Sequence, residues 1–584
     1  GELARLYGVL ANDEARALCD EQLVVTILAE RATPYEVAAA LDPDGPLVRF
    51  GLVRVGMGVG RPFHPLGVDK VVLKLLRGGS PVSELAPIVR PLAGTRSLAD
   101  IRIRSAVKDK LVRDLERTKA PLRIAARGRV GSGRHTLLAA IAASARQELG
   151  VIDASMMIRE PAQRTEGLRI ALERAHVSGL LPCIDGLDLI ASDDIIAREQ
   201  VREVLRRHPG PLAVRLSWDA QPPLDPGHVM VDVPTMSLTE RMAAWQGSLA
   251  STGLHVGDIT ELADRYSVGA GVIQKVCAEV VEADRETARH QANGQGNPDD
   301  AGGRLDVAVR QHLESRLGTT ANRVQRLASW AQVILPPDIL DSLTELIARI
   351  RHRRTVYDLW GFDRVLSTAR GVTALFSGGP GTGKTLVASA IANELGMDLY
   401  RVDLSRVMSK WIGETEQNLA KLFDAAEDGN AIILFDEADS LFAKRTEVKT
   451  SVDRYANLEV NYLLQRFDTF EGIAILTTNF GTSIDSAFKR RLSLRLTFPF
   501  PDEDQREKMW RAHMPPEVPV SGDFDLADIA RRYRLSGGYI RNCALRAAFI
   551  AAEEGGSLTN DHLERAIKAE FREIGKLAES GVLE

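Results

Sequence analysis

One glycine-rich stretch constrains the fold of this chain more than any other feature. Residues 378–385 have the sequence Gly-Gly-Pro-Gly-Thr-Gly-Lys-Thr, between an apolar run at 372–376 and a helix-like run at 386–392. A strand, a glycine loop and a helix in this order form a phosphate-binding loop, because loop amides and the helix N-terminus face the phosphates together. The stretch therefore predicts an α/β fold that binds a nucleotide.

Within this loop the side chains have separate expected tasks. Lys384 is expected to reach the β- and γ-phosphates, and the Thr385 hydroxyl to bind Mg²⁺. The glycines let the backbone turn its N–H groups inward. The residues expected to contact the nucleotide here are Gly379, Pro380, Gly381, Thr382, Gly383, Lys384, Thr385 and Leu386.

A second apolar run, at 431–435, ends in two carboxylates, Asp436 and Glu437. Such a run is typical of a strand buried in a parallel sheet. Asp436 is expected to hold Mg²⁺ through water, and Glu437 to polarise the attacking water, since phosphoryl transfer depends on positioning and charge stabilisation. The alternative, two solvated carboxylates at a strand end, is weak beside the phosphate-binding loop.

Further polar residues follow in the same region. The apolar run at 473–478 ends at Asn479, which can orient water or sense the terminal phosphate. Arg490 or Arg491 could reach a neighbouring subunit's nucleotide and neutralise transition-state charge, or both could be ordinary surface residues. Helices are expected over 503–513, 526–533, 537–553 and 560–574, and Arg541 is expected to point toward the nucleotide.

The chain contains an internal repeat. Residues 262–274 align without a gap with residues 529–541, and residues 128–136 repeat the loop glycines after a short apolar run. A repeat of this kind predicts two tandem modules, each with a phosphate-loop sheet and a helical lid.

In the first copy nearly every catalytic position is altered. Arg134 stands at the lysine position, and His135 at the metal-binding hydroxyl unless Thr136 takes that place by a one-residue shift. Gly186 stands at the catalytic glutamate and Gln274 at the position of the lid arginine, whereas Asp185 is retained. The first module is therefore predicted not to hydrolyse nucleotide. Whether it still binds one is left open.

The predicted fold class is α/β, with two tandem modules of parallel sheet and helical lid behind a small α+β N-terminal domain. Residues 284–305 lack an apolar period and contain many helix breakers, so they are read as part of a linker. The predicted segments are a winged-helix-like domain (1–102), a degenerate large subdomain (103–235), its lid (236–283), a linker (284–320), an active large subdomain (321–503) and a second lid (504–584).

The N-terminal domain is expected to consist of helices at 2–18, 21–28 and 34–41, followed by a hairpin that starts with a strand over 47–55. No basic recognition helix stands out, so protein docking or oligomer organisation is favoured over DNA binding. The basic run at 349–354 is most simply a solvated helix face, with a subunit-interface or nucleic-acid role as the alternative.

Bulk composition excludes several classes of protein. The net charge of −5 argues against a dedicated nucleic-acid binder. Cys19, Cys183, Cys277 and Cys543 lie far apart without a CxxC pair, so neither a disulfide framework nor a zinc site is expected. No apolar run has membrane-spanning length and no signal peptide is recognised, so a cytoplasmic protein without membrane contact is expected.

The order of these motifs resembles that of the AAA+ ATPases. The resemblance implies ATP and Mg²⁺ as cofactors and a homo-oligomeric ring, expected to be a hexamer. It also implies Asn479 as sensor 1, Arg490 or Arg491 as the arginine finger and Arg541 as sensor 2. By the same analogy the adenine lies against a segment that includes Ile334.

A motif between the two phosphate-site motifs adds a substrate class. Residues Lys410, Trp411, Ile412 and Gly413 are similar to the pore loop of protein-threading AAA+ enzymes, in which an aromatic and an aliphatic side chain grip an extended polypeptide. The alternative is that Trp411 anchors a small core. Residues 444–457 are polar and could form a second pore loop.

Residues 356–362, 453–457 and 498–502 are similar to a group of bacterial AAA+ proteins. Members with a winged-helix-like N-terminus are associated with contractile injection systems, which would make a component of such a system the partner. The resulting hypothesis is an ATP-driven protein remodeller whose hydrolysis is confined to the second module. The alternatives are a nucleotide-controlled assembly scaffold or switch and, with less support, a nucleic-acid motor.

Overall fold

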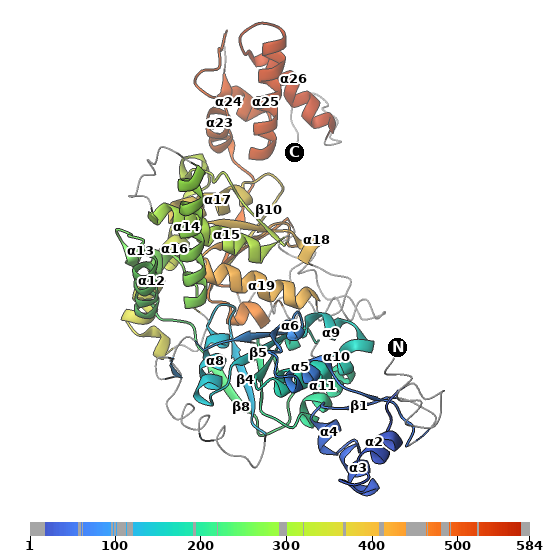
Figure 1. The fold of residues 1–584 in the computed structure, drawn as a ribbon. Helices are drawn as coiled ribbons and strands as arrows, with labels where there is room; N and C mark the ends of the chain where they lie inside the picture. Colours follow the sequence, from blue (N-terminus) through green and yellow to red (C-terminus); the bar gives the residue numbers. More distant parts are fainter. Residues whose placement is uncertain are drawn as a thin grey trace. The chain divides into compact units, whose positions relative to one another are not determined.

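The chain divides into two units, one formed by residues 1–244 and 268–274, the other by residues 245–267 and 275–584. The computed structural model (Figure 1) describes residues 18–56, 60, 62–94, 97–98, 101, 113, 121–190, 194–218, 220–290, 301–318, 320–365, 370–407, 414–439, 463, 465–479, 490, 492–521 and 525–573.

The first unit starts with a small helical region and a short hairpin. Its elements are α2 (Glu21–Ile27), α3 (Pro34–Ala40), α4 (Pro46–Arg49), β1 (Arg54–Val55), β2 (Leu66–Gly67), α5 (Lys70–Leu76) and α6 (Val82–Leu85). Thr33 and Glu36 form a capping box at the start of α3, which satisfies otherwise unpaired amides. β1 and β2 pair antiparallel.

The strand predicted over 47–55 is wrong for most of its length. Residues 46–49 form the helical turn α4, and only Arg54 and Val55 pair as a strand. Pro46 occupies the first turn of α4, where its fixed φ suits a helix and its missing N–H costs nothing. The first predicted helix, in residues 2–18, lies almost wholly outside the described residues.

A six-stranded sheet forms the centre of the first unit, in the order β8-β4-β7-β6-β5-β3. The strands are β3 (Val89–Leu92), β4 (Arg123–Gly128), β5 (Leu149–Asp153), β6 (Leu181–Asp185), β7 (Leu212–Leu216) and β8 (Val229–Val233). Neighbours from β5 to β8 pair parallel, and β3 pairs antiparallel with β5. β3 therefore belongs to this sheet, although the sequence-based division assigns it to the N-terminal domain.

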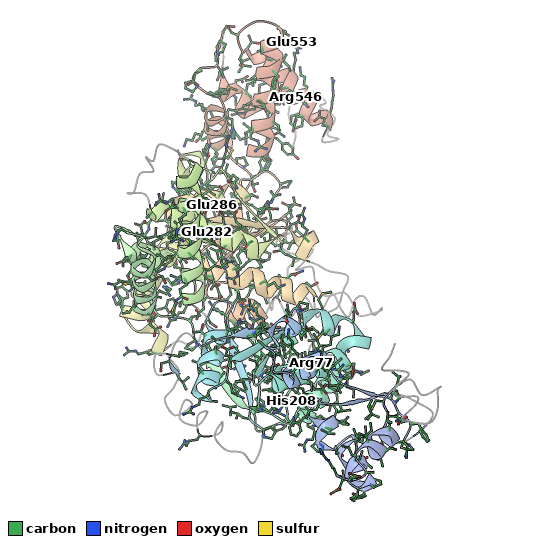
Figure 2. The ribbon with its side chains drawn as sticks, viewed as in Figure 1. Arg77, His208, Glu282, Glu286, Arg546 and Glu553 are labelled. Atoms are coloured by element: carbon green, nitrogen blue, oxygen red, sulfur yellow. The ribbon has the colours of Figure 1, made fainter. Side chains whose placement is uncertain are left out.

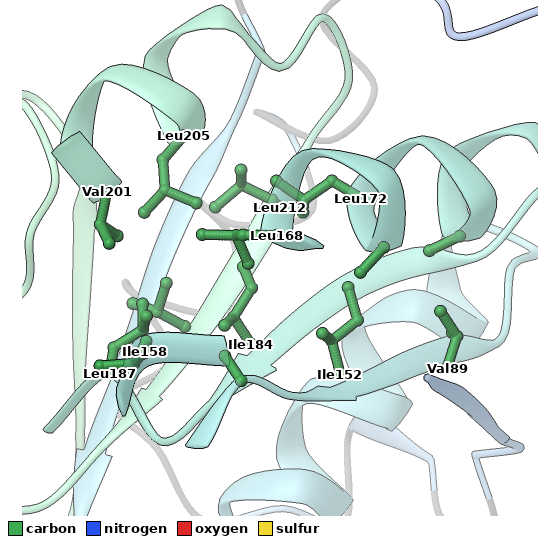
Figure 3. Packing of buried hydrophobic residues seen from close by; sticks show 14 of the residues in the cluster. Val89, Ile152, Ile158, Leu168, Leu172, Ile184, Leu187, Val201, Leu205 and Leu212 are labelled. Atoms are coloured by element: carbon green, nitrogen blue, oxygen red, sulfur yellow. The ribbon is translucent and has the colours of Figure 1, made fainter. Parts of the chain in front are cut away.

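Successive residues of β4 enter different cores, because side chains alternate across a sheet. Ile124 and Ala126 pack with α8 (Arg134–Ser144) on one face. Ala125 belongs to the opposite cluster, which Figure 3 shows closely. The helices that contribute to this second cluster include α9 (Ser155–Arg159), α10 (Pro161–Val177) and α11 (Ile195–Arg207).

The second unit contains a sheet of the same design, ordered β14-β10-β13-β12-β11-β9. The strands are β9 (Ala321–Arg323), β10 (Val372–Gly378), β11 (Leu399–Val402), β12 (Ile432–Phe435), β13 (Ile473–Thr478) and β14 (Leu494–Phe498). β9 pairs antiparallel with β11, and the other neighbours pair parallel. The prediction of two tandem α/β modules is confirmed, since each strand of one sheet has a counterpart at the same place in the other.

Helices also cover both faces of the second sheet. α16 (Pro337–Arg351) and α17 (Lys384–Leu395) pack into the core on one face, and α19 (Glu414–Asp428) packs into the core on the other. A short helix, α18 (Leu404–Val407), precedes α19. This three-layer arrangement leaves the carboxyl ends of the parallel strands available for a ligand site.

The helices predicted for the C-terminal lid are confirmed to within one residue at each end. They are α23 (Glu503–Ala512), α24 (Leu526–Arg532), α25 (Gly537–Glu553) and α26 (Asn560–Glu573). Arg546 on α25 (Figure 2) pairs with Glu573 on α26 across 2.6 Å, which fastens these two helices together. The corresponding helices of the first module are α12 (Leu238–Thr252), α13 (Ile259–Arg265) and α14 (Ala270–His290).

The linker predicted over 284–320 differs from the structure. α14 continues to His290, and α15 (Ala301–Leu317) occupies most of the later part. α15 buries one side chain per turn, and these residues are Ala301, Leu305, Val309, Leu313 and Leu317. Glycines at 302 and 303 make the start of this segment look like a linker in the sequence, although its apolar i, i+4 stripe packs within the second unit.

The described residues include no helix that combines the length and the apolar character needed to cross a membrane. The four cysteines carry free thiols.

Replacing Leu313, which is 2% exposed, by alanine tests whether α15 is a packed helix rather than a linker. Leu313→Ala is expected to lower the free energy of unfolding of the second unit by about 2–5 kcal/mol, because it leaves a cavity. The matched control is Val307→Ala on the same helix, where the side chain is 52% exposed and the expected change is within about 0.5 kcal/mol. Urea denaturation followed by circular dichroism measures both, and equal effects would contradict the packed helix.

Candidate functional site

The glycine loop of the second module connects β10 to α17, as the sequence predicts. Gly381 and Gly383 have φ angles of +74° and +96°, which glycine adopts without strain. At Gly381 a Cβ atom would also lie 2.5 Å from the Ser536 hydroxyl of the lid. Glycine is therefore required here both by the backbone conformation and by the close approach of the lid.

The Lys384 ammonium lies inside the loop. It donates hydrogen bonds to the Gly378 and Gly379 carbonyls, at 2.8 and 2.9 Å, and to Asn479 Oδ1 at 2.9 Å. Burial lowers the pKa of Lys384, against the attraction of Asp436 and two further carboxylates. Lys384 and Asn479, which the sequence places far apart, are thus brought into direct contact at the phosphate position.

Asp436 is the centre of a second hydrogen-bond network. The Thr385 hydroxyl donates to Asp436 Oδ1 at 3.0 Å, and the Thr477 hydroxyl donates to the same oxygen at 2.7 Å. Thr477 also accepts the backbone N–H of Glu437 at 3.0 Å. The hydroxyl of Thr385 and the carboxylate of Asp436 are hard oxygen donors, so together they suit Mg²⁺.

Thr477 is a functional-site residue that the sequence analysis missed. It is 1% exposed and lies next to last in β13. The available signal was a polar side chain near the end of an otherwise apolar strand. Its contact with the Glu437 amide has a clear purpose, because Glu437 has a φ of +55°, a conformation that is strained for a residue other than glycine and needs support.

The end of β13 is also held from the other side. The Thr478 hydroxyl donates to the Asp439 carboxylate, and the Asn479 backbone N–H donates to Asp439 Oδ2 at 3.4 Å. The Asn479 side chain is thereby kept beside Lys384.

A cavity of about 260 Å³ adjoins the loop and reaches the lid. Ile334 and Arg541, both predicted from the sequence, line it together. The complete lining is Gln332, Val333, Ile334, Leu335, Gly381, Thr382, Gly383, Lys384, Thr385, Leu386, Val387, Met509, Ala512, His513, Gly537, Gly538 and Arg541. One wall is apolar, as an adenine base requires, and the other carries the loop amides and cations that phosphates require.

The lid contacts the loop directly, since the Gly538 N–H donates to the Gly381 carbonyl at 3.0 Å. Burial and the nearby Arg541 lower the pKa of His513, so this imidazole is neutral near pH 7. Arg541 lines the cavity from the lid side.

The remaining predicted residues are placed as follows. Gly379 accepts hydrogen bonds from Lys384 and from the Thr382 hydroxyl, whereas Pro380 is exposed. Arg490 is exposed and is not among the residues that line the cavity. Arg491, the pore-loop residues Lys410, Trp411, Ile412 and Gly413, and the whole of the second pore-loop segment at 444–457 lie outside the described residues.

These features define the second module as a P-loop nucleotide-binding domain with a helical lid. Residues 374–500 match the family model described as "ATPase family associated with various cellular activities (AAA)". The match includes the glycine loop, Asp436, Glu437 and Asn479. This part of the chain is therefore an AAA ATPase domain, and the resemblance to that family is confirmed for it.

Several curated proteins are similar to part of this chain. The chain is 32% identical to 26S proteasome subunit RPT4 of Saccharomyces cerevisiae over 288 residues, which are 47% of this chain and 64% of the relative. It is 36% identical to the Cell division cycle protein 48 homolog of Archaeoglobus fulgidus over 28% of this chain and 23% of the relative.

A third relative is Katanin p60 ATPase-containing subunit A1 of Strongylocentrotus purpuratus, at 33% identity over 35% of this chain and 42% of the relative. In all three cases the chain spans less than two thirds of the relative's length.

Replacing Thr477 by valine keeps the shape of the side chain and removes its hydroxyl. Asp436 then loses one donor, and the Glu437 amide loses its acceptor. Leaving such buried groups unpaired costs about 1–3 kcal/mol, so ATP hydrolysis is expected to fall roughly 10- to 100-fold and to need more Mg²⁺. The measurements are kcat and the Mg²⁺ concentration that gives half-maximal activity.

The control is Thr477→Ser, which keeps the hydroxyl and is expected to restore most of the activity. If the serine and valine variants behave alike, the hydroxyl has no positioning role.

Proposed function

We propose that this protein is an ATP-driven protein remodeller in which the second module binds and hydrolyses ATP. The observation that carries this proposal is the network that joins Thr385, Asp436 and Thr477 beside the Lys384 ammonium. It brings oxygen donors that can bind a metal, an ammonium that can bind phosphate and the backbone of Glu437 to one edge of the sheet. Phosphoryl transfer is catalysed mainly by positioning and charge stabilisation, and this edge is suited to supply both.

Each residue then has a defined role. The loop amides, Lys384 and Arg541 bind the phosphates, and the apolar wall with Ile334 receives the adenine. Thr385 and Asp436 would hold Mg²⁺, which supplies charge neutralisation on the phosphate oxygens when bound. Asn479 orients the reacting groups from beside Lys384.

Glu437 is the proposed general base. Its backbone N–H is bound to Thr477, so its carboxylate projects from a backbone held in the left-handed region. Glu437 is exposed, and a glutamate in this position can accept the proton of the attacking water.

Assembly into a homo-oligomeric ring, with six subunits as the expected number, is part of the proposal. The sequence offers Arg490 and Arg491 just beyond β13, and Arg490 is exposed, as an arginine that serves a neighbouring subunit must be. Hydrolysis would then depend on contact between subunits.

Protein is the proposed substrate. The similarity to a proteasome subunit supports this choice, as does the pore-loop-like sequence around Trp411. A contractile injection system as partner rests on the sequence resemblance alone and stays a prediction, and so does a cytoplasmic location.

The basic run at 349–354 counts against a nucleic-acid motor. Arg349 pairs with Glu345 at 2.7 Å, and Arg351 pairs with Glu394 at 3.3 Å. Arg353 donates to the Glu471 carbonyl at 2.6 Å, and Arg354 pairs with Asp264 at 3.4 Å. Each of these arginines has an acidic or carbonyl partner within the second unit, which fits the simpler interpretation of a solvated helix face better than a phosphate-binding surface.

Replacing Glu437 by glutamine tests the proposed base. Glu437→Gln is expected to bind ATP normally and to hydrolyse it about 10²–10⁴-fold more slowly, because the amide cannot accept the proton. Phosphate release measures turnover, equilibrium binding measures affinity, and light scattering measures whether the ATP-bound variant accumulates as a ring.

The matched control is Lys384→Ala, which is expected to lose ATP binding as well as turnover. Hydrolysis by Glu437→Gln at the wild-type rate would contradict the assignment of Glu437.

Replacing Trp411 separates the remodeller from its rivals. Trp411→Ala is expected to keep ATP hydrolysis and to lose ATP-dependent unfolding of a fluorescent protein that carries an unstructured tail. Trp411→Phe keeps a large aromatic surface and is expected to retain unfolding.

Two other outcomes point elsewhere. Loss of ATP binding by Trp411→Ala would make Trp411 a core residue. Unchanged unfolding by that variant would exclude the proposed pore-loop role, and a wild-type chain that assembles with ATP but unfolds nothing would favour the nucleotide-controlled scaffold.

A further inference from the structure

The first module contains a glycine loop whose surroundings can be compared position by position with those of the second. In the second sheet Phe376 of β10 lies opposite Thr477, and in the first sheet Ala126 of β4 lies opposite Arg215. Phe376 and Ala126 each lie two residues before the first loop glycine. Arg215 therefore occupies the position of Thr477.

The neighbouring strands give the second equivalence. Phe435 pairs with Leu476 and precedes Asp436, and Ile184 pairs with Val214 and precedes Asp185. Asp185 therefore corresponds to Asp436, as the sequence comparison also indicates.

Both hydroxyls that hold Asp436 are replaced around Asp185. Arg215 Nε, in place of the Thr477 hydroxyl, donates to Asp185 Oδ1 at 2.7 Å. His135 Nε2, in place of the Thr385 hydroxyl, lies 3.0 Å from Oδ1 and 2.9 Å from Oδ2. The same carboxylate position thus receives a guanidinium and an imidazole in place of two neutral hydroxyls.

This exchange changes the electrostatics of the site. Burial alone would raise the pKa of Asp185, but the hydrogen bonds from His135 and Arg215 outweigh it and lower the pKa. Asp185 is 8% exposed and ionised, and the permanent charge of Arg215 balances it within the protein. A divalent cation at this carboxylate would lie next to that guanidinium and be repelled by it.

Arg134, the cation at the position of Lys384, also has a different hydrogen-bond partner. Arg134 is 4% exposed, and its Nη1 donates to the Leu216 carbonyl at the end of β7. Lys384, at the same position in the second module, bonds to the loop carbonyls from inside the loop. The Arg134 charge is therefore engaged by the sheet and not presented to a phosphate.

Gly186, at the position of Glu437, has no side chain that could act as a base, but its backbone keeps a left-handed conformation. Gly186 has a φ of +83°, and Glu437 at the corresponding position has a φ of +55°. A Cβ on Gly186 would lie 3.0 Å from the Ser155 amide nitrogen, which leaves little room for a side chain.

The loop of the first module is in close contact with its own lid segment. A Cβ on Gly269 would lie 1.9 Å from the Gly131 carbonyl oxygen, and the Val272 side chain lies 2.9 Å from the Cβ position of Gly131. Both lid residues belong to the first unit. The packing parallels the contact of Gly538 with Gly381 in the second module.

A transition-metal site is the competing interpretation, because donor atoms of His135, Cys183 and Asp185 lie within 4.8 Å of one another. The set is unsuited to a cation. The fully buried Cys183 thiol already donates to Asp185 Oδ1 across 3.9 Å. Arg215 already neutralises Asp185.

We propose that Arg215 and His135 do for Asp185 what a magnesium ion would do for Asp436, so that the first module is complete without a ligand. The residues present do not fit Mg²⁺-ATP. This module binds neither Mg²⁺ nor Mg²⁺-nucleotide, and its folded structure does not change with nucleotide or Mg²⁺.

The first test uses the full-length chain with Lys384→Ala, which disables the second site. Titration calorimetry with ATP and Mg²⁺ is expected to show one site per chain in the wild type and none in this variant. Saturable ATP binding by Lys384→Ala would overturn the proposal. A wild-type chain that binds no ATP would count against the proposed function, while leaving this inference standing.

The second test removes the internal cation. In the Lys384→Ala chain, Arg215→Thr is expected to lower the melting temperature of the first unit, and millimolar Mg²⁺ is expected to raise it again. The parent Lys384→Ala chain is expected to show no shift with Mg²⁺ or with Zn²⁺. A shift of the parent chain with either metal would overturn the proposal, as would an Arg215→Thr variant that melts like its parent.

The matched control is Arg127→Thr, on β4 of the same sheet. Arg127 pairs with Asp232 at 2.8 Å, but Asp232 is half exposed, so this pair contributes little to stability. Arg127→Thr is expected to melt like its parent with and without Mg²⁺. If it instead reproduces the Mg²⁺ response of Arg215→Thr, the effect does not belong to Asp185, and the proposal is wrong.

Discussion

The hydrogen bonds received by one carboxylate, that of Asp436, hold the catalytic edge of this protein together. They join α17 through Thr385 and β13 through Thr477 to the end of β12. They are possible only because β13 lies between β10 and β12 in the sheet, so that three segments far apart in the chain end side by side. Lys384 and Asn479 complete the same edge. The strand order of the sheet therefore brings the residues of the candidate site together.

The first module shows how little of that chemistry the fold itself requires. Its sheet has the corresponding strand order, and Asp185 receives two side-chain contacts at the corresponding positions. A guanidinium and an imidazole have taken the places of two hydroxyls, which satisfies the carboxylate without a metal. A buried carboxylate needs hydrogen-bond partners in either module. Neutral hydroxyl partners leave its charge available to a cation, whereas a guanidinium neutralises that charge.

Local signals were read correctly where one segment carries the whole meaning. The glycine loop, the carboxylates after β12 and the lid helices need only their own sequence, because turn chemistry, apolar runs and helix periodicity are local. Thr477 was missed, since its importance comes from Asp436 on another strand. The linker assignment failed over α15 because glycines at its start hid a stripe that becomes stable only when packed.

The sequence by itself determined that the chain carries two phosphate-loop modules, that the second has the residue types for hydrolysis and the first lacks most of them, and where the loops and the second lid's helices lie. Only the tertiary structure decided what replaces the lost chemistry: that Arg215 binds Asp185, that Arg134 turns to the end of β7, and that Thr477 supports Glu437. The physical reason is that these contacts join neighbouring strands and loops. Parallel pairing brings together residues that are far apart along the chain, so their contact cannot be inferred from their positions in the sequence.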